Sequence, residues 1–148
     1  MNTGKRALLT LFVVAGLSAL LPGFIYTAGI LKVHGRPTPA DPTDFDRKSL
    51  AAVWMACREK PPMTVQPLNP WGVATRLLLS DLSANPGERT ARQIARRHNI
   101  ANPVGNSTWW HISGAALTIW ITRNWSAEQI SATAVRDQLC VRRRTVGP

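Results

Sequence analysis

Residues 108–122 read TWWHISGAALTIWIT, carry no formal charge and are apolar nearly all round. A helix that is hydrophobic on every side is buried, in a protein core or in a membrane. Because this stretch is too short to cross a bilayer comfortably, we expect a central buried helix that is capped by Ser107 and runs to about Arg123.

The sequence on either side predicts four more helices, over residues 44–60, 69–85, 88–98 and 126–140. Asn69 followed by Pro70 is typical of an N-cap and a first helical position, and Ser126 with Gln129 has the pattern of a capping box. We find no strand alternation and no hairpin turn, so the sequence predicts an all-α fold. The helix over 69–85 places four apolar residues on one face: Trp71, Ala74, Leu78 and Leu82.

Near the N-terminus, residues 7–31 (ALLTLFVVAGLSALLPGFIYTAGIL) also carry no charge. About 20 apolar residues span a bilayer core, so this stretch is long enough to do so. A cleaved signal peptide is the alternative, but we find no convincing small-x-small cleavage site. We therefore predict an uncleaved anchor, with the following domains: a membrane anchor over 1–32, a Pro-rich linker over 33–43, a helical domain over 44–140 and a basic tail over 141–148.

The two cysteines, Cys57 and Cys140, suggest on which side of the membrane the helical domain lies. In an oxidising compartment they could join the first and last helices of the domain, and so long a loop could contribute about 4 kcal/mol of stability in the chain-entropy model. Two unrelated buried thiols are the alternative. Basic residues after the span slightly favour an internal domain, although a long domain can be exported regardless of charge. We predict a single-pass inner-membrane protein with its domain on the periplasmic or extracytoplasmic side.

The amino-acid composition limits the kinds of ligand and site that we expect in this chain. The chain has 148 residues, a net charge of +10 and 18 Lys and Arg residues, most of them Arg. Arg forks suit phosphate and carboxylate groups, so an anionic partner is plausible. The three His residues lack metal-ligand spacing and no glycine loop could cradle a phosphate; we predict neither a metal nor a cofactor. The best positive feature is a polar stripe on the helix over 88–98, which could bind a pyrophosphate: Arg89, Arg92, Gln93 and Arg96.

Three blocks of sequence resemble the peptidoglycan transglycosylases of glycosyltransferase family 51. They are the NPWGV..R run over 69–76, the TARQIAR run over 90–96, and residues 110–130, which align without a gap on the family's Arg-Lys-x-x-Glu helix and the Tyr-Ser turn after it. The resemblance covers roughly residues 68–136. It implies an all-α, lysozyme-like domain behind one N-terminal anchor, and a role in polymerising lipid-linked disaccharide-peptide outside the cell.

The family's catalytic residues are missing. Arg58 stands at the position of the catalytic base, with Glu59 one residue away, and the second family glutamate falls on Gly114. A base that takes a proton from an acceptor hydroxyl needs a carboxylate within hydrogen-bond reach. We therefore predict a non-catalytic, transglycosylase-like cell-envelope protein, a pseudoenzyme that contacts the lipid-linked peptidoglycan precursor, the glycan or an envelope partner. Arg92, Gln93 and Arg96 match the family's second motif and would bind the lipid pyrophosphate.

Three other interpretations stay open. In the first, the chain is a divergent active peptidoglycan glycosyltransferase and Glu59 is its catalytic residue. In the second, residues 91–100 form the first helix and turn of a helix-turn-helix that binds nucleic acid, although the next helix is Trp-rich and uncharged where base-reading side chains are expected. In the third, the chain is a structural subunit of a membrane complex, with Trp109 and Trp110 as its contact surface.

Overall fold

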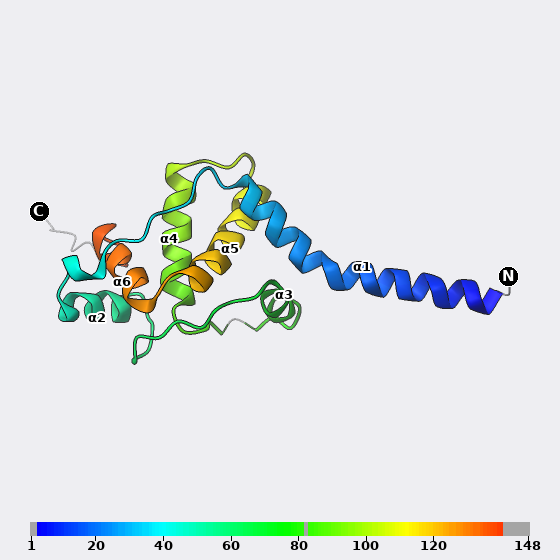
Figure 1. Cartoon of the computed structure of the whole chain (residues 1–148), viewed down its shortest axis with the longest axis horizontal. Coiled ribbons are helices and arrows are strands. Elements are labelled where there is room, and N and C mark those ends of the chain that lie inside the picture. The colour runs from blue at the N-terminus through cyan, green and yellow to red at the C-terminus, as the bar shows by residue number, and fades with distance from the viewer. Residues whose placement is uncertain (1–2, 82, 141–148) are drawn as a thin grey trace, which may run out of the picture.

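The computed structural model describes residues 3–81 and 83–140, and within these ranges every regular element is helical (Figure 1). The predicted all-α fold is therefore confirmed. The described elements, in chain order, are α1 (Thr3–Lys32), a 3₁₀ turn η1 (Pro42–Asp44), α2 (Arg47–Ala56), α3 (Pro70–Leu78), α4 (Glu88–Ala101), α5 (Ser107–Asn124) and α6 (Ala127–Arg136).

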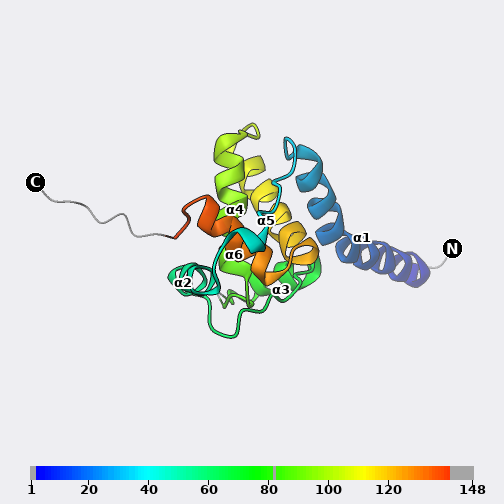
Figure 2. The same cartoon turned by 60° about the vertical axis from the view of Figure 1, so that its left-hand side comes forward.

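Helix α5 lies at the centre, as its uncharged sequence predicts. The C-terminal part of α1 packs against it on one side and α4 on the other (Figure 2), and α6 packs against α2 and α4. The main core is formed between these helices by nine buried side chains, those of Trp54, Ala91, Ile94, Ala95, Leu117, Ile121, Trp125, Ala127 and Ile130. The buried face of α5 thus organises the domain around a helix whose sequence has no polar side.

Local capping signals fix where most helices begin. Asn69 accepts a hydrogen bond from the backbone N–H of Gly72, and both halves of the capping box between Ser126 and Gln129 are formed. Helix α5 differs by one residue from the prediction: the side chain of Asn106, rather than Ser107, accepts from Trp109 N at 3.1 Å. Asn and Ser are comparable N-cap residues, so the sequence alone does not choose between neighbours.

Three helices are shorter than predicted. Helix α6 ends at Arg136 instead of continuing to residue 140, and residues 137–140 form turns. Helix α2 begins at Arg47, because Asp46 accepts from the backbone N–H of Ser49, and residues 42–44 form the separate turn η1. Helix α3 ends at Leu78 instead of continuing to residue 85. Leu82 of its expected apolar face lies outside the described residues, while Leu78 is 85% exposed. The apolar face of α3 therefore points away from the core.

Helix α1 is long and apolar enough to cross a membrane over Leu8–Lys32. It contains Pro22 and bends part-way along its length (Figure 1); a proline inside a helix removes one backbone hydrogen bond and produces such a bend. Before the bend, the apolar side chains of α1 are exposed. After it, Gly29 lies so close to α5 that a Cβ atom there would be 2.8 Å from the Cβ of Ala116. The last turns of α1 are thus part of the domain.

The segment 33–43, which we expected to be a linker, packs along the domain. The backbone N–H of Ala40 donates to Thr133 Oγ1 at 2.9 Å, and the guanidinium of Arg36 lies 5.0 Å from the centre of the Trp120 ring. The Pro-rich sequence thus forms an extended strap that is held by side chains of α5 and α6. This strap holds the domain close to the end of α1.

Of the two possibilities for the cysteines, a disulfide or two separate thiols, the structure has the disulfide. Cys57, at the end of α2, is bonded to Cys140, which follows α6, and their Cα atoms are 5.1 Å apart. The bond closes a loop with a sequence separation of 83 residues and joins the end of α2 to the chain after α6. The basic tail over 141–148 lies outside the described residues.

Candidate anion-binding site

Glu59, the one carboxylate near the expected catalytic position, has a structural role. Its oxygens accept hydrogen bonds from Gly87 N and Thr90 N, both at 3.1 Å, and from Thr90 Oγ1 at 3.4 Å. Gly87 is the N-cap of α4 and has no side chain that could accept a hydrogen bond from the first turn. Glu59, from a distant part of the chain, accepts from these backbone N–H groups in its place. A carboxylate also stabilises the positive end of the helix dipole.

A mostly apolar cavity of about 370 Å³ lies between α3, α4 and α5. Its apolar wall includes Leu68, Val73, Leu77 and Ile119, and its polar side is formed by residues spaced along α4. Ligand sites in proteins are commonly concave and mostly apolar, with a few convergent polar groups. This cavity has that composition, and Gly114 of α5 lines it too.

One acidic residue, Glu88, lies among the cavity-lining residues of the described chain. Its side chain is 5% exposed and is paired with two guanidinium groups: Arg76 Nη2 donates at 2.8 Å, and Arg92 Nη2 donates to the other oxygen. Asn85 N donates as well, at 3.1 Å. Because both oxygens are engaged with cations, Glu88 is poorly placed to take a proton from a substrate hydroxyl.

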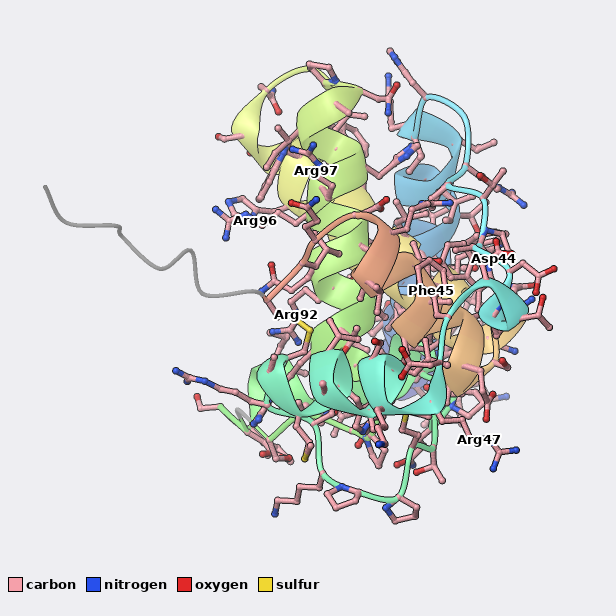
Figure 3. The ribbon with its side chains drawn as sticks, turned by 90° about the vertical axis from the view of Figure 1, so that its left-hand side faces the viewer. Asp44, Phe45, Arg47, Arg92, Arg96 and Arg97 are labelled. Atoms are coloured by element: carbon pink, nitrogen blue, oxygen red, sulfur yellow. A yellow bond between two sulfur atoms is a disulfide. The ribbon has the colours of Figure 1, made fainter. Side chains whose placement is uncertain are left out.

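The four residues of the predicted pyrophosphate-binding stripe separate into two pairs. Arg92 and Arg96 line the cavity and lie one above the other along α4 (Figure 3). Arg89 turns away and donates to Arg58 O at 2.8 Å, and Gln93 is exposed outside the cavity wall. Positions 88, 92, 96 and 99 share the cavity side of the helix because they are one helical turn apart.

The Arg96 side chain makes no ion pair or hydrogen bond with any part of the chain that the structure describes, and it is exposed at the cavity. The Arg92 side chain is 63% exposed although it is paired with Glu88. The cavity therefore presents one guanidinium that is unengaged by described residues and a second whose remaining N–H groups face solvent. Paired guanidinium groups of this kind bind phosphate oxygens with charge-assisted hydrogen bonds.

Asn99 adds a hydrogen-bond acceptor. It is 1% exposed and lines the cavity, and its Nδ2 group donates to Ser113 Oγ at 2.9 Å and to Trp110 O at 3.2 Å. The Oδ1 atom has no hydrogen-bond partner among the described residues. A buried acceptor without a partner costs free energy, and a ligand hydroxyl or amide N–H in the cavity would supply one.

The two candidate interface tryptophans face different surroundings. Trp110 lines the cavity and its ring makes an edge contact with His111 at a centroid distance of 5.0 Å. Trp109 is half-buried and its ring lies 5.5 Å from Lys32 Nζ at the end of α1. His111 is exposed and lines the cavity.

Glu88, Arg76 and Asn99 were not predicted from the sequence as members of this site. The spacing of Glu88 and Arg92, four residues apart on one helix, is a signal for their ion pair. Arg76 ends the NPWGV..R block but joins the cluster only through the fold. Among the described residues, no three His, Cys, Asp or Glu side chains come together as a metal site.

The chain has no significant match among protein-family models, curated proteins or solved structures.

Proposed function

We propose that this protein is a single-pass membrane protein whose helical domain binds a lipid-linked peptidoglycan precursor through its pyrophosphate, without polymerising it. The observation that carries the proposal is that Arg92 and Arg96 both line one apolar cavity. Two guanidinium groups suit a pyrophosphate, and the apolar wall suits the first isoprene units of a lipid carrier. Asn99 Oδ1 would accept from a sugar hydroxyl or amide.

Three features support a non-catalytic role. Glu59 is used as a helix cap, Glu88 is held by two arginines, and the position of the family's second glutamate is occupied by Gly114. Glycosyl transfer to an acceptor hydroxyl needs a carboxylate that is able to take the proton. Binding without transfer would let the protein hold or present the precursor to an envelope partner.

The disulfide supports placing the domain outside the cytoplasm, since such bonds form and persist in oxidising compartments. Labelling of intact cells with a membrane-impermeant thiol reagent tests this placement. We expect Cys57 and Cys140 to react only after prior reduction. Reaction without reductant, and only after lysis, would place the domain in the cytoplasm.

A nucleic-acid-binding role is less well supported. In a helix-turn-helix, α5 would enter the major groove. Leu117 and Ile121 of α5 are fully buried, and α1 and α4 cover two of its sides. That arrangement leaves too little of α5 to read base edges.

Arg96 and Arg97 provide a matched pair for the binding test, because both are exposed arginines of α4 but only Arg96 lines the cavity. We expect R96A to weaken binding of lipid-linked disaccharide-peptide to the detergent-solubilised full chain about tenfold, the effect of losing roughly 1.5 kcal/mol of charge-assisted hydrogen bonding. The R97A variant should bind like the wild type. Equal weakening by both variants would indicate diffuse charge attraction and contradict the proposed site.

Activity is tested in the same preparation by following polymer formation from the precursor. We expect none. Polymer that is formed by the wild type and lost in E59Q would make the chain a divergent glycosyltransferase.

A further inference from the structure

The end of α3 carries an apolar surface that the domain does not cover. Leu77, Leu78 and Leu79 are 74%, 85% and 74% exposed, and Trp71 at the start of the helix is 49% exposed. We name Leu77, Leu78 and Leu79 the α3 tip. Three consecutive leucines in a helical end point in directions about 100° apart, so a flat protein surface could cover at most part of the α3 tip. A fluid apolar medium could surround all of it.

The position of α3 along α1 points to a lipid bilayer as that medium. Trp71 Nε1 donates to Ala19 O at 2.7 Å, and a Cβ atom at Gly23 would lie 3.0 Å from the Trp71 ring. Helix α3 is therefore fixed against α1 at the level of residues 19–23, beside the bend at Pro22 (Figure 1).

Ala19 and Gly23 belong to the stretch that is long and apolar enough to cross a membrane, Leu8–Lys32. At the rise of an α-helix they lie about 17 Å and about 23 Å from Leu8, whereas a bilayer core is about 30 Å thick. If α1 crosses the bilayer, α3 meets it inside or at the edge of the domain-side leaflet. Tryptophan is enriched at that depth, which agrees with the place of Trp71.

The charged groups beside the α3 tip are turned away from it or lie farther along the chain. Arg76 donates to Ser83 O at 2.6 Å and to Glu88 Oε2 at 2.8 Å, which holds its guanidinium against the domain. Asp81 follows the tip and accepts from Ser83 N at 2.9 Å. The tip itself therefore presents only hydrocarbon, as an interfacial helix does.

We propose that α3 is a second membrane contact, with the α3 tip immersed in the domain-side leaflet. Because Leu77 also lines the cavity, the cavity would then open at the lipid boundary. This inference rests on α1 crossing the membrane and is independent of which ligand the cavity binds.

Spin labels at single introduced cysteines in the full chain, reconstituted in nanodiscs with the native disulfide intact, test the immersion. Leu78→Cys probes the α3 tip. Phe12→Cys is the control for lipid, since Phe12 is an exposed residue within the span, and Arg97→Cys is the control for water. We expect the label at 78 to be accessible to oxygen like the label at 12, and several-fold less accessible to a water-soluble nickel complex than the label at 97.

A label at 78 that is as accessible to nickel as the label at 97 would overturn the inference. Spin–spin broadening at 78 would also overturn it, because it would show that a second copy of the chain covers the tip. Nickel accessibility at position 12 would show that α1 does not cross the membrane, and the inference would fail with it. Leu79→Cys repeats the measurement on a second exposed side chain and should give the same depth.

Discussion

The Thr90 backbone N–H donates to the Glu59 carboxylate at 3.1 Å, and the Thr90 hydroxyl donates to the same oxygen at 3.4 Å. Thr90 is fully buried and Glu59 is 8% exposed. We therefore expect E59A to lower the free energy of unfolding by about 1–3 kcal/mol, because it leaves buried N–H groups of α4 without an acceptor. Thermal unfolding of the purified chain measures the loss.

The E59Q variant separates this capping role from a catalytic one. An amide oxygen can still accept from α4, so E59Q should be closer to the wild type in stability than E59A. If Glu59 were a catalytic base, E59Q would leave stability nearly unchanged but would abolish a measurable activity. The activity, rather than the stability, of E59Q therefore decides between the two roles.

Glu88 restrains Arg92 and neutralises part of the cavity, so its removal should have two opposite effects. With Arg76 left beside a buried uncharged amide, E88Q should destabilise the fold by about 3 kcal/mol. The same variant should bind inorganic pyrophosphate more tightly, because Arg92 no longer has an internal anion. Calorimetric titration and thermal unfolding of one preparation give both numbers, and a variant that lost both stability and affinity would contradict competition between Glu88 and the ligand.

The disulfide contributes to stability through the length of the loop that it closes. We expect the double variant C57S/C140S to lose about 4 kcal/mol, following the chain-entropy model for a loop of this size. Dithiothreitol should lower the unfolding temperature of the wild type and leave that of the double variant unchanged. An equal response of both proteins to the reductant would show that the bond is not formed in solution.

Asp46 makes part of the stability depend on pH. Its carboxylate accepts from the backbone N–H and the hydroxyl of Ser49, which holds the pKa of Asp46 below its ordinary value of 3.8. A lowered pKa means that the carboxylate stabilises the fold fully above the ordinary value and loses that effect as the pH falls through the folded-state pKa. The D46A variant should therefore unfold at a lower temperature than the wild type at pH 7, and the gap should narrow in acid.

Asn is also a good N-cap residue, so D46N is the control for this titration. It should remain close to the wild type at pH 7. A gap between D46A and the wild type that stays constant from neutral pH to acid would contradict the role of the Asp46 charge.

The sequence predicted those parts of the structure that depend on neighbouring residues. The caps at Asn69 and Ser126 lie next to the helices that they start, and the uncharged run over 108–122 needs no partner to indicate burial. The cap of α4 by Glu59 could not be predicted, because its donors are 28 and 31 residues away.

Only part of the candidate site could be predicted, because its other residues come together through contacts between distant parts of the chain. A basic stripe on α4 was visible in the sequence, but only the packing of α3 and α5 shows that Arg92 and Arg96 reach the cavity while Arg89 and Gln93 do not. The apolar face of α3 gave an ambiguous signal, since a stripe of leucines has the same pattern whether it meets protein or lipid. Leu78 is exposed because α3 lies beside α1 rather than against the core.

The close packing of α1 on α5 makes a prediction about two glycines of the same helix. At Gly29 an added Cβ atom would be 2.8 Å from the Ala116 Cβ and 3.0 Å from the Ile112 carbonyl oxygen, neither of which can move without shifting α5. At Gly16 an added Cβ atom would meet nothing within 4 Å. Alanine favours a helix over glycine by about 1 kcal/mol at either position, whereas overpacking costs about 1–3 kcal/mol.

We therefore expect G16A to leave the unfolding temperature unchanged or slightly raised, and G29A to lower it. The near-ultraviolet circular dichroism of the tryptophans, followed during heating in detergent, reports the domain rather than the free part of α1. If G29A is as stable as G16A, α1 does not pack on α5 at Gly29, and the domain then begins at the strap instead of including the last turns of α1.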